Sequence, residues 1–224
     1  SFIWADGGEE LYFTAPTDGT IQIFKVDHPG RKKKAPLVEQ ISEGMFDVTG
    51  IIGEKDGKLY VTRTSMNQAA EIYSFDLMTR EFQQLTFLND AVYQKMTLPE
   101  VEQRYVTTAD GKKMLVWVIF PPDFDPSKKY PTLLYAQGGP QSPLSQFYSF
   151  RWNFQLMASQ GYIIVAPNRR GMPGHGVEWN EAISKDWGGL AMQDYLTAID
   201  EVAKEFYVDP ERLGAVGASF GGYS

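Results

Sequence analysis

The chain has 224 residues, of which 43% are hydrophobic, 22% charged and 14% aromatic, and this composition excludes a disordered polymer and a collagen-like repeat. Its net charge of −7 argues against binding to the phosphate backbone of a nucleic acid or to an anionic membrane surface. The sequence contains no cysteine, which excludes disulfides, Cys-ligated zinc, iron–sulfur clusters and a thiol nucleophile within it.

No apolar run approaches the ~20 residues that a membrane-spanning helix needs, and we expect no membrane insertion. The one dense basic run, residues 31–34, follows a Pro-Gly pair, which indicates a solvated loop rather than a binding patch. We also expect no cofactor and no metal. An oligomer is compatible with the sequence, and the compartment stays open between periplasm and cytoplasm, with the periplasm favoured.

A repeat occupies the first ninety-odd residues. Each copy has an Asp-Gly pair (6–7 and 56–57) followed by short β-rich runs, and Tyr12 and Tyr60 hold equivalent positions. A period of ~40–50 residues with several strands per unit is typical of β-propeller blades. Because a closed propeller needs roughly four to eight blades, we expect residues 1–95 to be the last blades of a larger one. The alternative is a small two-sheet β domain.

After about residue 95 the repeat ends and the pattern of apolar residues changes. Residues 101–107 and 115–120 predict a β-hairpin, which Pro121-Pro122 ends because proline cannot donate to a β-ladder. Further along, the sequence predicts a nearly all-apolar strand at 132–136, a short helix at 150–160 and a second buried strand at 162–166.

A longer helix is predicted from about residue 189 to residue 206, followed by a third buried strand at 213–217. The apolar positions of the helix recur at 3.6 spacing and predict one buried stripe: Tyr195, Leu196, Ile199, Val202, Ala203 and Phe206. Alternating strands and helices predict a mostly parallel sheet with helices on its faces. The fold class expected for residues 96–224 is therefore part of an α/β-hydrolase.

The third strand runs into Gly217-Ala218-Ser219-Phe220-Gly221, which has the pattern G-x-S-x-G. In this pattern the serine occupies a strained turn between strand and helix, where side chains two positions before and after it would collide. The turn presents the hydroxyl at a helix N-terminus, where backbone N–H groups stabilise an oxyanion. We therefore predict Ser219 as a catalytic nucleophile. The alternative is a glycine-rich turn in which Ser219 only caps a helix.

A second oxyanion donor is expected from the loop at residues 137–140, Gln-Gly-Gly-Pro, which follows an earlier strand. The residues leave two donors open, a backbone N–H near Gly139 and the side-chain amide of Gln137. A serine nucleophile also needs a base. His28 is expected in a solvated loop. His175 lies in a glycine-rich loop but precedes the serine, opposite to the chain order of this fold.

Several motifs in this order resemble the prolyl oligopeptidase family of serine peptidases, and most closely its acylaminoacyl-peptidase and dipeptidyl-peptidase V branch. They are the propeller-like repeat, the Gly-Gly-Pro loop, Asn168-Arg169-Arg170-Gly171, Asp186-Trp187-Gly188-Gly189, Asp209-Pro210-Glu211-Arg212 and Gly217-Ala218-Ser219-Phe220-Gly221-Gly222. The resemblance covers essentially the whole chain, but only the middle of such a protein.

The resemblance implies that Ser219 is the nucleophile and that the backbone N–H of Phe220 is one oxyanion donor. Relatives place Tyr or His where Gln137 stands, and a neutral amide would replace that side-chain donor here. The triad Asp and His would lie beyond Ser224, and the propeller would act as a lid that admits short peptides. The family's dipeptidyl peptidases hold a peptide N-terminus with acidic residues, but Glu71 is expected on a solvated blade edge, as are Glu9 and Glu10.

The function predicted from these observations is a serine peptidase that hydrolyses short peptides through an acyl-enzyme on Ser219. The 224-residue chain alone is predicted to be inactive, because the acid and the histidine of the triad would be missing. Two alternatives remain at this point. One is a hydrolase of small esters on the same fold, and the other is a non-catalytic binding or scaffold protein with a degenerate hydrolase domain.

Overall fold

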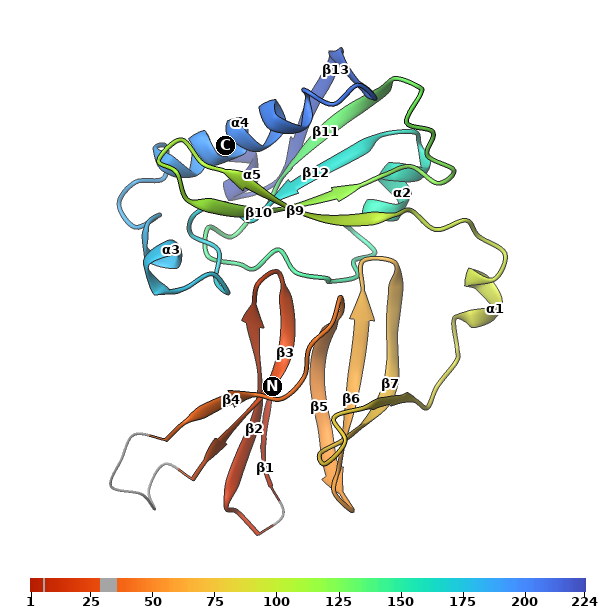
Figure 1. Ribbon diagram of the computed structural model, residues 1–224, viewed down its shortest axis with the longest axis vertical. Helices are drawn as coiled ribbons and strands as arrows, with labels where there is room; N and C mark the ends of the chain where they lie inside the picture. Colours follow the sequence, from red (N-terminus) through yellow and green to blue (C-terminus); the bar gives the residue numbers. More distant parts are fainter. Residues whose placement is uncertain (6, 29–35) are drawn as a thin grey trace. The chain divides into compact units, whose positions relative to one another are not determined.

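The computed structural model describes residues 1–5, 7–28 and 36–224 (Figure 1). The chain divides into two compact units, one of Ser1–Lys95 with Ser145–Tyr148 and one of Met96–Leu144 with Ser149–Ser224. The short segment Ser145–Tyr148 therefore belongs to the first unit, although the residues on both sides of it belong to the second. The basic run at 31–34, predicted as a solvated loop, lies outside the described residues.

Two four-stranded antiparallel sheets form the first unit (Figure 1). The first sheet consists, in spatial order, of β1 (Phe2–Trp4), β2 (Glu10–Thr17), β3 (Thr20–Asp27) and β4 (Val38–Gln40). The second consists of β5 (Asp47–Lys55), β6 (Lys58–Ser65), β7 (Gln68–Asp76) and β8 (Phe82–Gln84), and the short helix α1 (Asp90–Tyr93) follows. Four consecutive antiparallel strands are the arrangement of a propeller blade, and the two sheets repeat it in the predicted register.

Each of the two sheets contains a tight Asp-Gly turn between neighbouring strands. Asp56 and Gly57 join β5 to β6 with φ of 53° and 73°, and Asp18 and Gly19 join β2 to β3 with φ of 43° and 75°. Two consecutive positive φ values are the requirement of a type I′ hairpin turn, which Asp-Gly meets at low steric cost. Nine buried residues from both sheets and their connection then form one core: Tyr12, Ile23, Ile41, Phe46, Val48, Ile51, Leu59, Val61 and Phe75.

Asp47 is a fully buried carboxyl group at the start of β5. Its Oδ1 accepts hydrogen bonds from the backbone N–H groups of Ile21 (2.9 Å) and Gln146 (3.1 Å), and its Oδ2 accepts one from the Ser145 hydroxyl (2.6 Å). Burial raises the pKa of Asp47 to about 6, although the three hydrogen bonds act in the opposite direction. This carboxyl group thus bonds Ser145 and Gln146 to the rest of the first unit, as does the Met66 N–H, which donates to Oε1 of Gln146.

The Asp47→Asn variant is expected to flatten the pH dependence of stability. An unfolded Asp has a pKa near 3.8, and between that pH and about 6 the folded chain keeps a proton that the unfolded chain has lost. The free energy of unfolding contributed by Asp47 therefore falls as pH rises through this window, by on the order of 2 kcal/mol. Asparagine retains the acceptor oxygen and does not titrate.

Urea unfolding of the full chain at pH 4.5 and pH 7 measures this difference. The wild-type chain should lose more stability across the interval than Asp47→Asn does. Asp56→Asn, on an exposed hairpin turn of the same unit, is the control for loss of one carboxylate. Equal pH dependence in wild type and Asp47→Asn would contradict the prediction.

The second unit is built on one five-stranded sheet in the order β13-β11-β12-β10-β9. The strands are β9 (Val101–Thr107), β10 (Lys113–Ile119), β11 (Tyr130–Ala136), β12 (Ile163–Pro167) and β13 (Val208–Gly217). β11 runs parallel to β12 and β13, whereas β10 runs antiparallel to β9 and β12. The mostly parallel sheet predicted from the sequence is found in part: only β10 runs against the other strands, but the predicted hairpin joins this sheet and makes two of its four strand pairs antiparallel.

Four helices accompany this sheet: α2 (Phe154–Ser159), α3 (Val177–Glu181), α4 (Leu190–Val202) and α5 (Phe220–Tyr223). Alternate residues of β10 face a core shared with α4, and the intervening Leu115, Trp117 and Ile119 are buried on the opposite face. Both faces of β10 are thus covered, as an apolar strand requires.

Four sequence predictions about these elements need correction. The helix expected at 150–160 is shorter, and α4 ends at Val202 rather than 206. Leu196 and Phe206 of the predicted stripe are 60% and 69% exposed, whereas Asp194 is fully buried on α4. The strand expected to be buried at 213–217 is largely exposed, since β13 is an edge strand that has a partner on one side only among the described residues.

Candidate active site

Ser219 occupies the turn between the edge strand β13, which ends at Gly217, and the short helix α5, which begins at Phe220. Its φ of 59° and ψ of −125° place it in a region that residues with a side chain rarely adopt. Such a conformation costs of order 1–3 kcal/mol and persists only where the surrounding structure enforces it. The strained turn expected from the G-x-S-x-G pattern is therefore present.

The two glycines of the pattern are required by close backbone approaches. A Cβ on Gly217 would lie 2.4 Å from the carbonyl oxygen of Gly221, directly across the turn. A Cβ on Gly221 would lie 1.9 Å from the carbonyl oxygen of Ala136, at the end of the neighbouring strand β11. The first glycine thus relieves the collision across the turn that the sequence predicts. The second allows the turn to pack against β11.

The backbone N–H of Phe220 is available as a hydrogen-bond donor. The following N–H groups bond back to the turn, that of Gly221 to the carbonyl of Ala218 and that of Gly222 to the carbonyl of Ser219, both at 3.0 Å. Among the described residues, no backbone carbonyl accepts from the Phe220 N–H. The Phe220 side chain is buried, which fixes the direction of this donor.

The loop after β11 lies against this turn. A Cβ on Gly138 would lie 2.8 Å from the Ala218 carbonyl oxygen and 3.5 Å from Cβ of Ser219. The sequence pointed to Gln137 and Gly139, and Gly138 between them also lies against the turn of the serine. Gly139 has a φ of 55°, which suits glycine, and its carbonyl accepts a hydrogen bond from the N–H of Ser142 at 3.0 Å.

Tyr135 holds the side chain of Gln137. The buried Tyr135 hydroxyl donates to Oε1 of Gln137 at 2.7 Å, and the described residues offer no acceptor bonded to Nε2 of Gln137. Burial raises the pKa of Tyr135 to about 12, which keeps the hydroxyl protonated and able to donate. The amide group of Gln137 is therefore oriented with its N–H₂ donors free.

Arg169 connects the loop to the turn. Its guanidinium is fully buried and donates to the carbonyl oxygens of Pro140 (2.8 Å) and Gln137 (3.4 Å), at opposite ends of the loop. It also donates to the Tyr195 hydroxyl at 3.0 Å and lies 4.4 Å from the centroid of the Phe220 ring. One buried cation thus contacts the flanks of both predicted oxyanion donors.

The adjacent Arg170 anchors the loop after β12. It bonds Asp194 of α4 through its backbone N–H, Nε and Nη2 at 2.8–3.0 Å, and it bonds Asp110 through Nη1 and Nη2 at 2.9 Å. The hydrogen bond to Asp194 is the main cause that holds the pKa of Arg170 above its ordinary value. This pairing explains why a carboxylate of α4 is buried, which the apolar spacing of the helix did not indicate.

The two histidines have local roles. His28, expected in a solvated loop, is half-buried and stacks on Trp4 with ring centroids 5.1 Å apart. His175 lies edge-on to Trp179 of α3 at 6.4 Å. Within the described ranges, no group of three or more His, Asp or Glu side chains is placed to hold a metal ion. No helix of the described chain is long and apolar enough to cross a membrane.

Sequence reasoning missed the roles of Arg169 and Tyr135. Arg169 follows a fully buried apolar strand within a motif of two consecutive arginines, and this position was a signal that at least one of them would be buried. Tyr135 is two residues before Gln137 and therefore points to the same face of the chain as it leaves β11. Neither contact could be derived from spacing alone, because each depends on where the strands pair.

Comparison with known proteins agrees with this geometry. Residues 148–224 match the model of the prolyl oligopeptidase family. Dipeptidyl-peptidase 5 of Porphyromonas gingivalis is 45% identical over 99% of the chain, and that of Porphyromonas endodontalis is 42% identical over 96%. The chain spans 31% and 30% of the length of these two relatives.

A solved structure shows the same fold. The acylaminoacyl peptidase of Pyrococcus horikoshii is 27% identical, with a TM-score of 0.81, and the match covers 96% of this chain and 32% of that one. Together with the turn at Ser219, these matches show that the chain belongs to the prolyl oligopeptidase family.

Proposed function

We propose that the protein is a serine peptidase that hydrolyses short peptides through an acyl-enzyme on Ser219. The observation that carries this proposal is the strained backbone of Ser219, next to a Phe220 N–H that lacks an acceptor among the described residues. Relatives named dipeptidyl-peptidase 5 support a peptide substrate. So does a solved acylaminoacyl peptidase in complex with Z-Gly-Gly-Phe-chloromethyl ketone.

In the proposed reaction, Oγ of Ser219 attacks the scissile carbonyl carbon while a base takes its proton. The carbonyl oxygen becomes an oxyanion that accepts hydrogen bonds from the Phe220 N–H and from Nε2 of Gln137. Collapse of this intermediate breaks the C–N bond, and the leaving amine takes the proton from the base. Water then hydrolyses the acyl-enzyme. The acid and histidine that complete the triad are proposed to lie beyond Ser224.

A fluorophosphonate probe on the full-length protein tests the nucleophile. Labelling is expected in the wild type and should be lost in Ser219→Ala, because the probe phosphonylates an activated serine. Absence of labelling under conditions that label a control hydrolase would leave a non-catalytic role for the fold. The isolated 224-residue chain should not label, since the proposed base lies outside it.

Turnover of two substrates separates a peptidase from an esterase on the same fold. The full-length protein is expected to cleave a dipeptidyl p-nitroanilide with a measurable kcat, and a simple aryl ester more weakly. Hydrolysis of the ester alone would refute the peptidase proposal and leave the serine chemistry intact.

Tyr135→Phe is expected to lower kcat for the dipeptidyl anilide on the order of tenfold, with little change in KM, because misplaced groups slow the chemical step. Loss of the hydroxyl frees the Gln137 amide to rotate, so that Nε2 no longer faces the developing charge for most of the time. Tyr130→Phe, on the same strand but bonded to the Asp125 N–H, is the matched control. Equal kcat in the two variants would assign the second donor to the backbone near Gly139.

A further inference from the structure

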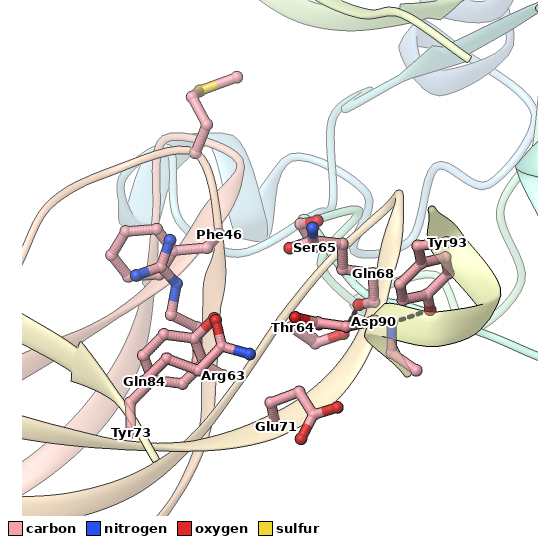
Figure 2. A pocket seen from close by; sticks show the side chains of 12 residues that line it. Phe46, Arg63, Thr64, Ser65, Gln68, Glu71, Tyr73, Gln84, Asp90 and Tyr93 are labelled. Carbon is pink, nitrogen blue, oxygen red and sulfur yellow. Dashed lines mark hydrogen bonds between the residues drawn. The ribbon is translucent and has the colours of Figure 1, made fainter. Parts of the chain in front are cut away.

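A small pocket of about 130 Å³ opens in the first unit, among side chains of β6, β7 and α1 (Figure 2). Its lining includes Phe46, Arg63, Glu71, Tyr73 and Asp90. All of these residues belong to the first unit, whereas Ser219 belongs to the second.

Arg63 is a cation held by aromatic rings alone. Its guanidinium carbon lies 3.7 Å from the centroid of the Phe46 ring, 4.8 Å from that of Tyr73 and 5.4 Å from that of Phe82. Burial lowers the pKa of Arg63, but arginine stays protonated in proteins. Among the side chains drawn in Figure 2, none is joined to this guanidinium by a hydrogen bond.

The cross-strand neighbour of Arg63 does not neutralise it. Glu71 lies opposite Arg63 in the register of β6 and β7 and is 7% exposed, so the solvated edge predicted from the sequence was wrong. Its Oε2 accepts from the Thr86 hydroxyl, and its Oε1 accepts from the N–H and the Nδ2 of Asn89 at 3.0 and 2.8 Å. Burial would raise the pKa of Glu71, but these bonds outweigh it and lower that pKa. The carboxylate is thus already satisfied.

The geometry of Arg63 indicates the ligand it suits. The guanidinium carbon lies over the Phe46, Tyr73 and Phe82 rings, and the five N–H donors of a guanidinium lie in its plane. Arg63 also lines the pocket. A planar fork of donors matches a carboxylate in bidentate geometry. Two more carboxylates, Glu71 and Asp90, line the pocket and would repel a dianion such as phosphate more strongly than a monoanion.

We propose that this pocket is a binding site for the carboxylate group of a small ligand, which pairs with Arg63. Two sources share this chemistry, a free carboxylic acid and the carboxyl terminus of a short peptide. The pocket volume of about 130 Å³ restricts either to a few heavy atoms beyond the carboxylate. Pairing supplies the partner that a partly buried cation otherwise lacks.

Calorimetric titration of the full-length protein in the Ser219→Ala background tests this site without turnover. The probes are N-acetylglycine, N-acetylglycinamide and propionate. N-acetylglycine is expected to bind at least about tenfold more tightly than its amide, because a charge-assisted bidentate bond is lost with the carboxylate. Arg63→Gln should reduce that preference to about one, and Arg63→Lys should keep part of it because the charge remains.

Arg80→Gln is the matched control, since Arg80 is an exposed arginine of the same unit that pairs with Glu39. It should bind N-acetylglycine as the wild type does. Tighter binding of N-acetylglycine than of propionate would identify a peptide terminus, and equal binding would identify a small acid, with both results supporting the site. If the protein that retains Arg63 bound N-acetylglycine and N-acetylglycinamide with equal affinity, the proposal would be overturned. Unchanged binding by a folded Arg63→Gln variant would overturn it as well.

Discussion

Gly221→Ala is expected to destabilise the second unit by more than about 4 kcal/mol and to abolish turnover, because it belongs to the small class of severe backbone clashes. The added Cβ would lie 1.9 Å from the Ala136 carbonyl oxygen and 2.7 Å from its carbonyl carbon. Both contacts are with backbone atoms of β11, which cannot rotate away. Relief requires the turn at Ser219 to move off the strand that carries Gln137.

Gly222→Ala provides a control one residue further along. A Cβ on Gly222 would meet its nearest atom, the Gly217 carbonyl oxygen, at 3.6 Å, which is an ordinary contact. Alanine also has a higher helix propensity than glycine. Urea unfolding followed by tryptophan fluorescence should therefore place Gly222→Ala near the wild type and Gly221→Ala far below it. Equal midpoints for the two variants would contradict the packing of the turn on β11.

For the proposed peptidase, Arg169→Met is expected to lower kcat of the full-length protein by about 10³-fold, since loss of one oxyanion donor costs 10²–10³ and Arg169 contacts the flanks of both proposed donors. The carbonyls of Pro140 and Arg170 lose buried donors at the same time, which should cost about 3 kcal/mol of stability. Arg169 is a positioning residue rather than a catalytic one. Its loss should therefore appear in kcat much more than in KM.

Two further variants separate positioning from general destabilisation. Arg212→Met removes an exposed arginine of the same unit, which bonds Asp209 and the Lys129 carbonyl, and should leave kcat unchanged. Arg169→Lys keeps the positive charge and an N–H donor that can bond one of the loop carbonyls, so its kcat should be higher than that of Arg169→Met. A loss of kcat in Arg169→Met that disappears when the protein is assayed well below its unfolding temperature would argue against the positioning role.

Much of the site could be predicted because its constraints are local. The collision that makes Gly217 necessary lies within five consecutive residues, and the predicted turn at Asp56-Gly57 sets its own hairpin, whereas Asp6 of the other predicted pair lies outside the described residues. The hairpin at 101–107 and 113–119 and the apolar strands were likewise indicated by nearby residues. These features need no knowledge of the rest of the fold.

Contacts between distant residues could not be predicted in the same way. Apolar spacing placed Leu196 in the buried stripe of α4, yet Leu196 is exposed and Asp194, whose partner Arg170 is 24 positions away, is buried. Glu71 was expected on a solvated edge. Its side chain is instead buried against Thr86 and Asn89, which follow β8 in the chain and which the local pattern around Glu71 does not indicate. In each case a charged group is buried against a partner that the local pattern does not contain.

The segment Ser145–Tyr148 belongs to the first unit but follows much of the second in the chain, and this affects the order of folding during synthesis. The strands of the first unit are complete at β8, but the backbone and hydroxyl donors from residues 145 and 146 that satisfy Asp47 are made some sixty residues later. A chain made from its N-terminus therefore exposes a four-stranded sheet with a carboxyl group that still lacks two of its three hydrogen-bond donors. Until residues 145 and 146 are made, the Ile21 N–H is the one of these three donors that the carboxyl group has, and the first unit reaches its final stability only after β11 of the second has been made.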